Sequence, residues 1–134
     1  MLGLPDGMSY RVLVLPPVET ITLPLLRKID DLADAGATII GAVQPPQKSP
    51  SFVEMGEGDA EVQRIAAKLW PKLVTGKTAA QLLGERGVKP DFSATPHLRC
   101  IHRISPEMDI YFVANREERG VDSIASFRVT GKQP

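Results

Sequence analysis

The sequence is poor in cysteine and carries no excess of either charge, and each shortage excludes a class of function. One cysteine among 134 residues rules out an intrachain disulfide and any metal site built from several thiolates. This usage fits a reducing compartment, but a secreted protein without disulfides has the same composition, so the localisation stays open. Sixteen basic and sixteen acidic residues cancel. The basic ones are spread along the chain, which argues against a nucleic-acid or membrane partner.

Long apolar runs and glycine-rich loops are also missing. No apolar run approaches the roughly 20 residues that span a bilayer, and we expect no signal peptide because no basic region precedes an apolar one at the N-terminus. The turn after the first predicted strand reads LPPVET, and its prolines offer no backbone N–H groups to a phosphate. The sequence therefore predicts no cofactor and no metal site.

The apolar residues that are present follow the periods of strands and helices. The segment 11–15 begins with Arg11 and continues with four apolar residues closed by two prolines, which predicts a strand buried on both faces. Helical spacing then predicts a helix that begins after Thr22 and ends before Gly36. A second buried strand is expected over 38–43. Strand, helix and strand form a βαβ unit, whose strands should be parallel.

The rest of the chain predicts two more helices and then strands. A helix is expected over 59–70, and a shorter one begins at Thr78, where Gln81 completes a capping box. Strands over 98–104, 109–115 and 121–130, joined by short turns, predict an antiparallel meander. We therefore expect an α/β fold in two parts, which are an α/β accessory domain over 1–96 and an antiparallel meander over 97–134. The meander either extends the same sheet or begins a following β-domain.

The cysteine and the two histidines read as structural residues. Cys100 lies inside a predicted strand and not at a strand-to-helix elbow, so we interpret it as a buried structural thiol. His97 and His102 fall on opposite faces of one strand and cannot share a metal ion. We interpret both as loop or surface histidines held by local hydrogen bonds. A role for His102 and Asn115 in holding a turn or a neighbouring domain is left open.

The carboxyl edge of the two parallel strands is the expected ligand site. Ligands of open α/β sheets bind at that edge; Glu19 follows the first strand, and Gln44, Glu54 and Glu57 follow the second. A glycosidase needs two carboxylates about 5 Å or about 6.5–9.5 Å apart, and spacing along the chain cannot supply that distance. An N-cap at Asp59 and favourable charges near helix N-termini explain these acidic residues better. We therefore predict no catalytic residue.

Several stretches of the chain resemble one enzyme family. LPDGMSYRVLVLP, the hairpin IHRISPEMDIYFVAN and the closing FRVTGKQP resemble the middle of large bacterial α-L-rhamnosidases of glycoside hydrolase family 106. The resemblance implies a segment that lies after the catalytic (β/α)-barrel, where the acid and base reside, so it carries over no catalytic residue. The α/β part also resembles the flavodoxin-like or amidotransferase-like accessory domain of some β-galactosidases. This second resemblance implies a three-layer arrangement.

Three functions follow as alternatives. The first is a non-catalytic accessory segment that scaffolds the remaining domains of a rhamnosidase-like glycoside hydrolase. The second is a module that binds a carbohydrate or a small metabolite at the carboxyl edge of the strands. The third is an oligomerisation module in which exposed strand edges pair between copies of the chain, since unpaired edges offer free N–H and C=O groups.

Overall fold

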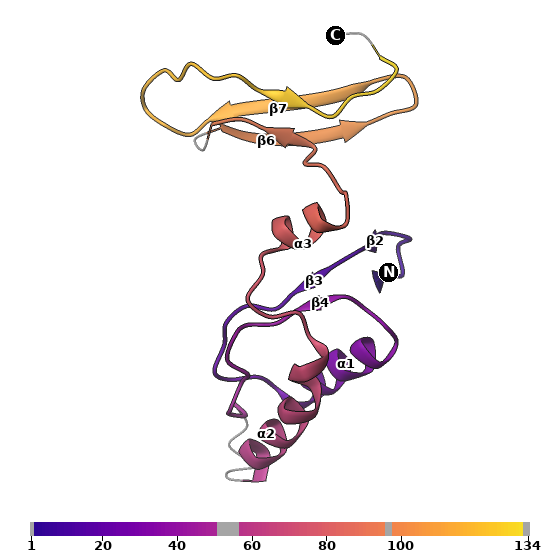
Figure 1. Cartoon of the computed structure of the whole chain (residues 1–134), viewed down its shortest axis with the longest axis vertical. Coiled ribbons are helices and arrows are strands. Elements are labelled where there is room, and N and C mark those ends of the chain that lie inside the picture. The colour runs from indigo at the N-terminus through magenta and orange to yellow at the C-terminus, as the bar shows by residue number, and fades with distance from the viewer. Residues whose placement is uncertain (1, 51–56, 96–97, 133–134) are drawn as a thin grey trace. The chain divides into compact units, whose positions relative to one another are not determined.

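The computed structural model describes residues 2–50, 57–95 and 98–132 (Figure 1). The chain divides into two compact units, Met1–Leu82 (unit 1) and Leu83–Pro134 (unit 2), and each is described by itself. This division falls earlier in the chain than the expected boundary at residue 96. The assignment of an accessory domain and a following β-domain stays a prediction.

Unit 1 contains the predicted βαβ arrangement. β3 (Leu13–Val14) and β4 (Ile39–Ile40) pair in parallel, and α1 (Leu23–Asp34) connects them. Thr22 precedes the helix in an extended conformation, although its side chain makes no capping hydrogen bond. Gly36 follows the helix with φ +80°, a conformation that glycine adopts without strain. The parallel pairing and the position of this helix are confirmed. A short antiparallel pair, β1 (Leu2–Gly3) with β2 (Ser9–Tyr10), precedes them.

The prediction that the first strand is buried on both faces is wrong. Val14 of β3 is 52% exposed, whereas both residues of β4 are buried. β4 is flanked on its other side by Val74, which donates its N–H to the Ile39 carbonyl and accepts one from Gly41. In the described part of the chain β3 pairs with β4 alone. The first strand is therefore an edge strand, and one of its faces stays open.

The core of unit 1 lies between α1 and α2 (Glu57–Leu69), which continues into a 3₁₀ turn, η1 (Trp70–Lys72). The predicted apolar side of α2 is the buried one. Asp59, however, does not cap this helix. It lies in the first turn, and its Oδ1 accepts a hydrogen bond from the Ser49 N–H at 2.7 Å. The core residues of the unit are Ile21, Leu23, Leu26, Ile29, Ile39, Val62, Ile65, Leu69 and Leu73.

The short helix α3 (Ala79–Glu85) begins with the predicted capping box. The Thr78 N–H donates to Gln81 Oε1 at 2.8 Å, and the Gln81 N–H donates to Thr78 Oγ1 at 3.2 Å. Each residue thereby satisfies a donor that the first turn leaves without a partner. Gly87 follows the helix with φ +73°. Both predicted ends of this helix are confirmed.

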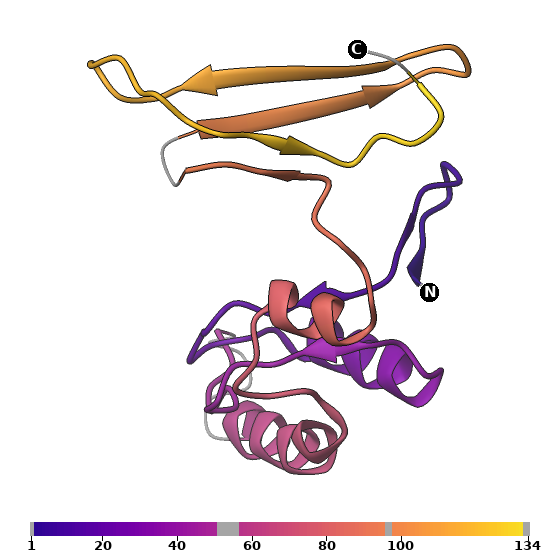
Figure 2. The same cartoon turned by 45° about the horizontal axis from the view of Figure 1, so that its top comes forward.

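Unit 2 is built on the hairpin of β6 (Leu98–Ile104) and β7 (Asp109–Asn115), with the predicted bounds. Its turn is closed by Ser105, whose N–H donates to the Met108 carbonyl at 2.9 Å. The predicted three-stranded meander is wrong. The last strand, β8 (Ser126–Phe127), pairs with β5 (Phe92–Ser93) and not with β7. In Figure 2 the β5 and β8 segments run along the hairpin as a second pair.

Aromatic packing explains why the last strand leaves the meander. The ring of Phe127 lies 5.3 Å from that of Phe92 and 4.9 Å from that of Tyr111, to which it stands edge-on. These contacts hold β8 over one face of the hairpin instead of beside β7, because aromatic pairs prefer tilted and edge-to-face contacts at such distances. The described fold is thus mixed α and β with small two-stranded sheets.

Candidate functional site

The expected ligand edge of unit 1 carries an apolar cavity. It has a volume of about 540 Å³ and is lined by β3, the residues that follow β3, and α1. Val18 and Leu25 in its wall are exposed. Gln44 and Lys28 provide polar groups at a lining that is otherwise mostly aliphatic and proline side chains. Such a lining suits an apolar side chain or ring better than a sugar, whose hydroxyls need hydrogen-bond partners.

The expected ligand residues do not gather in this cavity. Gln44 lines it, whereas Glu19 is exposed and its carboxylate pairs with Lys48 at 2.7 Å. Glu57 opens α2 and is also exposed. Glu54 lies outside the described residues. A ligand-binding role for these four residues stays a prediction.

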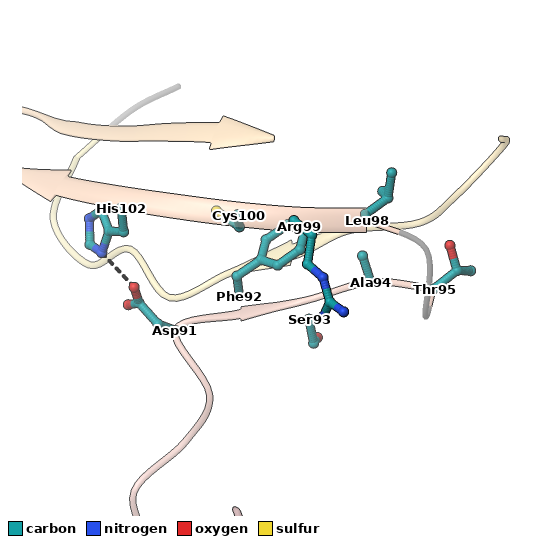
Figure 3. Close-up of a pocket in the computed structure, with 9 residues that line it drawn as sticks. All are labelled: Asp91, Phe92, Ser93, Ala94, Thr95, Leu98, Arg99, Cys100 and His102. Atoms are coloured by element: carbon teal, nitrogen blue, oxygen red, sulfur yellow. Dashed lines mark hydrogen bonds and ion pairs between the residues drawn. The ribbon is translucent and has the colours of Figure 1, made fainter. Parts of the chain in front are cut away.

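His102 lies at the centre of a polar cluster in unit 2 (Figure 3). Its Nδ1 is 2.6 Å from Asp91 Oδ2, and its Nε2 is 2.8 Å from Asp109 Oδ1. Its side chain is 12% exposed, and its ring stacks on Tyr111 with a centroid distance of 3.9 Å. The imidazole therefore bridges two carboxylates that come from different segments of the chain.

Two basic side chains complete the cluster. Arg128 Nη2 lies 3.1 Å from Asp91 Oδ1, and Lys132 Nζ lies 2.8 Å from Asp109 Oδ2. Lys132, and after it His102, hold the pKa of the Asp109 carboxyl below its usual range. Burial, and then the charge of Asp91, raise the pKa of the Tyr111 hydroxyl. We call these six residues the His102 cluster: Asp91, His102, Asp109, Tyr111, Arg128 and Lys132.

The register of the hairpin places half of this cluster. Tyr111 lies directly opposite His102, and Asp109 lies two residues before Tyr111 on the same face. His102 is held by hydrogen bonds as predicted, but its partners come from separate segments of the chain and its side chain is mostly buried. The interpretation of His102 as a loop or surface histidine with local partners is therefore wrong. The alternation of β7 could have indicated Asp109. No pattern indicated Asp91, which precedes β5, or Arg128, which follows β8.

The other singled-out side chains of unit 2 have structural surroundings. Asn115 donates its Nδ2–H to the Arg119 carbonyl at 2.7 Å and accepts the Glu117 N–H at 2.9 Å, so it holds the turn after β7. Cys100 is a free thiol that is partly exposed, which corrects the prediction that it is buried. It lines a cavity of about 520 Å³ with Asp91 and His102 (Figure 3). His97 lies outside the described residues.

The His102 cluster lacks the geometry of a glycosidase acid and base. A catalytic pair faces a sugar from two sides across an open space. Asp91 and Asp109 instead bind opposite nitrogens of one imidazole and line different cavities. Among the residues that the structure describes, no group of three or more His, Cys, Asp or Glu side chains is arranged to hold a metal ion. Within the same ranges, no helix is long and apolar enough to cross a membrane.

Comparison with known proteins gives one family and one relative. The family model for alpha-L-rhamnosidase, Glyco_hydro_106, matches residues 1–134. A protein of Formosa agariphila named "Putative beta-glucuronidase" is 38% identical over 135 residues, a match that covers 97% of this chain and 11% of that relative. The chain thus spans about one ninth of the relative's length. No solved structure matches the chain.

Proposed function

Since this chain belongs to the α-L-rhamnosidase family, glycoside hydrolase family 106, we propose that it is a non-catalytic accessory segment of a larger glycoside hydrolase. Its role is to scaffold other domains of that enzyme. The small share of the relative that the match covers supports this proposal, because a region of this size is one part of a much longer polypeptide. The remaining domains of that polypeptide are its proposed partners.

The main support for the proposal is that the carboxylates of Asp91 and Asp109 in unit 2 are engaged by other side chains. Asp91 and Asp109 each bind His102 and one basic side chain, Arg128 or Lys132. A general acid or a nucleophile must instead present a free oxygen to the glycosidic bond. In this arrangement the two carboxylates join β5, the hairpin and the residues after β8 into one unit.

Carboxylates of unit 1 are also used to join elements. Lys68 Nζ of α2 lies 2.9 Å from Asp30 Oδ2 of α1, and Lys72 pairs with the same carboxylate at 3.0 Å. Glu61 of α2 binds Arg64 at 2.7 Å and reaches Arg27 of α1 at 3.5 Å. The pairs of Asp30 with Lys68 and Lys72, and of Glu61 with Arg27, join α1 to α2 and the turn that follows it. The Glu61–Arg64 pair lies within α2.

A hydrolysis assay tests the proposal. The purified chain is incubated with an aryl α-L-rhamnoside, and with an aryl β-D-glucuronide because of the name of the relative. We expect no release of the aryl alcohol above that of a heat-denatured sample. Turnover that disappears in Asp91→Asn, Asp109→Asn, Glu19→Gln or Glu57→Gln, with the circular dichroism spectrum unchanged, would overturn the proposal.

A second candidate function is the binding of a small molecule at the cavity beside Gln44. The position of this cavity at the carboxyl edge of β3 favours it, and the apolar lining favours an apolar metabolite over a carbohydrate. Titration followed by NMR separates the two candidates. Saturable shifts of the amides at Gln44 and Thr20 on addition of a ligand support binding, and their absence with rhamnose oligosaccharides and with apolar ligands argues for scaffolding alone.

We also propose that unit 1 contributes to a three-layer, flavodoxin-like domain in the longer enzyme. The edge position of β3 and the exposure of Val14 support this arrangement, because a further strand or helix could add there. In the longer protein, we expect the amide hydrogens of β3 to exchange with solvent more slowly than in the isolated chain. Equal exchange rates would contradict the three-layer arrangement.

A further inference from the structure

One face of the β6–β7 hairpin is apolar and uncovered. Side chains opposite each other in register lie on the same face, so Ile101 with Phe112 and Arg103 with Ile110 share the face that points away from His102. Ile101, Ile110 and Phe112 are 60%, 53% and 66% exposed. The other face packs on the β5 and β8 segments, through Asp91 and Phe127. We call Ile101, Arg103, Ile110 and Phe112 the outer face.

The charge on this face has one sign. Arg103 supplies this charge. Arg99 alternates onto the same side of β6, but its side chain extends beside Ser93 and lines a cavity together with Asp91 and His102 (Figure 3). Neither arginine side chain has a hydrogen-bond or ion-pair partner among residues 2–50, 57–95 and 98–132. No acidic residue of β6 or β7 lies on this face. The surface therefore combines bare apolar side chains with the Arg103 guanidinium group, which is free to donate hydrogen bonds to a carboxylate.

A second copy of the chain is a poor occupant of the outer face. A two-fold pairing sets the same patch against itself, which gathers the arginines of both copies over one apolar area with no acidic group between them. Like charges placed together across a dry surface oppose association. The sign of the charge therefore favours a different surface that carries acidic groups.

We propose that the outer face docks an acidic amphipathic segment of the same enzyme that lies outside residues 1–134. The segment places apolar side chains over Ile101 and Phe112 and a carboxylate beside Arg103. This inference rests on the proposed scaffolding function. The relative that matches this chain over 11% of its length has ample polypeptide outside the match to supply such a segment.

Paired peptides test the docking. The isotope-labelled chain is titrated with a synthetic amphipathic helix whose apolar stripe is flanked by Glu, and with a matched peptide that has Lys at the same positions. We expect saturable shifts at the amides of β6 and β7, with at least tenfold tighter binding of the acidic peptide. Equal affinity for the two peptides, shifts confined to other elements, or no saturation with either peptide would overturn the proposal.

Substitutions on the face sharpen the result. Arg103→Glu should remove the preference for the acidic peptide, whereas Arg11→Glu makes the same charge change at an exposed residue of unit 1 and should leave it intact. Phe112→Ser should weaken binding at least tenfold and still fold, because that side chain is exposed. Equal effects of Arg103→Glu and Arg11→Glu would reduce the effect to net charge and contradict the proposal.

Two controls distinguish docking of an acidic segment from dimerisation of the chain and from failure of the scaffolding proposal. Sedimentation of the chain alone should show a monomer, and a dimer that Phe112→Ser abolishes would show that a second copy occupies the face. Glycoside hydrolysis by the chain would contradict the scaffolding function, but it would not change the outcome of the peptide titration. Lack of peptide discrimination in an inactive chain would contradict the docking alone.

Discussion

His102 and Tyr111 lie directly opposite each other on β6 and β7, and their rings stack at an interplanar angle of 11°. The stack and the two carboxylates confine the imidazole from three sides. Cross-strand pairs are the units that stabilise a sheet, and here such a pair also anchors the β5 and β8 segments. The His102 cluster is therefore expected to stabilise unit 2.

Substituting His102 separates the stack from the hydrogen bonds. His102→Phe keeps an aromatic ring on Tyr111 and removes both carboxylate contacts, whereas His102→Ala removes both kinds of contact. Both variants should lower the free energy of unfolding of unit 2, and the alanine variant should lose about 1 kcal/mol more because aromatic pairs contribute about that much. Urea unfolding followed by the NMR signals of unit 2 measures the difference. Two variants of equal stability would show that the stack contributes nothing.

The pH dependence of unit 2 should reflect Asp109. Lys132 and His102 lower the pKa of Asp109 from its usual 3.8 in the folded state. A carboxyl with a lowered pKa stabilises the fold above its unfolded pKa, and this contribution is lost as the pH falls through the folded pKa. Unit 2 should therefore lose stability below about pH 4, and Asp109→Asn should lose less over the same range. The same slope in both proteins would contradict this role.

Glu61 provides the corresponding test in unit 1. Its hydrogen bond with Arg64 lowers the pKa of Glu61 from 4.5 to about 2. The stability that this carboxylate contributes is present above pH 4.5 and is lost between pH 4.5 and about 2. Glu61→Gln should flatten the pH dependence of unfolding of unit 1 in that window and leave unit 2 unchanged. An unchanged slope for unit 1 would contradict the role of this ion pair.

Gly41 can take a side chain only if the side chain of Leu73 moves. A Cβ added there would lie 2.9 Å from Leu73 Cδ1 and 3.5 Å from Trp70 Cε2, and a packed core resists extra volume at a cost of about 1–3 kcal/mol. Gly41→Ala should therefore destabilise unit 1 by about 1 kcal/mol or more in urea unfolding. Gly84→Ala in α3 is the control, since its Cβ meets nothing within 4 Å. No loss of stability in Gly41→Ala would show that the Leu73 side chain can move away at no cost.

Two neighbouring leucines of α1 should differ sharply. Leu26 is 0% exposed in the core, whereas Leu25 is 53% exposed in the wall of the apolar cavity. Leu26→Ala should cost about 2–5 kcal/mol of unfolding free energy because it empties a packed site. Leu25→Ala should cost less than about 1 kcal/mol. Similar losses of stability in the two variants would contradict the assignment of Leu26 to the core and Leu25 to the exposed face of α1.

The elements with a clear period could be predicted from the sequence. The apolar stripe of α1, the capping box of α3 and the alternation of β6 and β7 are local signals, and the structure has all of them. Two interpretations failed because the deciding contacts lie far apart in the chain. β3 is an edge strand and Val14 on it is exposed, and an apolar run reveals neither feature. β8 pairs with β5 through Phe92 and Phe127, and strands of two residues have no period to detect.

The candidate site shows the same division. The hairpin register places His102 with Tyr111 and Asp109, and this much was within reach of the sequence. Asp91, Arg128 and Lys132 join the cluster only through the folding of the β5 and β8 segments onto the hairpin. The sequence predicted a ligand site at the carboxyl edge of β3 and β4 instead, and the cavity at that edge is apolar.

The proposal that the carboxylates of unit 2 are structural is tested most directly by measuring stability and hydrolysis on one variant, Asp91→Asn. Asp91 binds His102 and Arg128 and also accepts from the Tyr111 hydroxyl at 3.5 Å. If Asp91 has a structural role, Asp91→Asn should unfold at a lower urea concentration than the unaltered chain. Neither protein should release the aryl alcohol from an aryl rhamnoside. Hydrolysis by the unaltered chain that Asp91→Asn abolishes, at unchanged stability, would contradict the account.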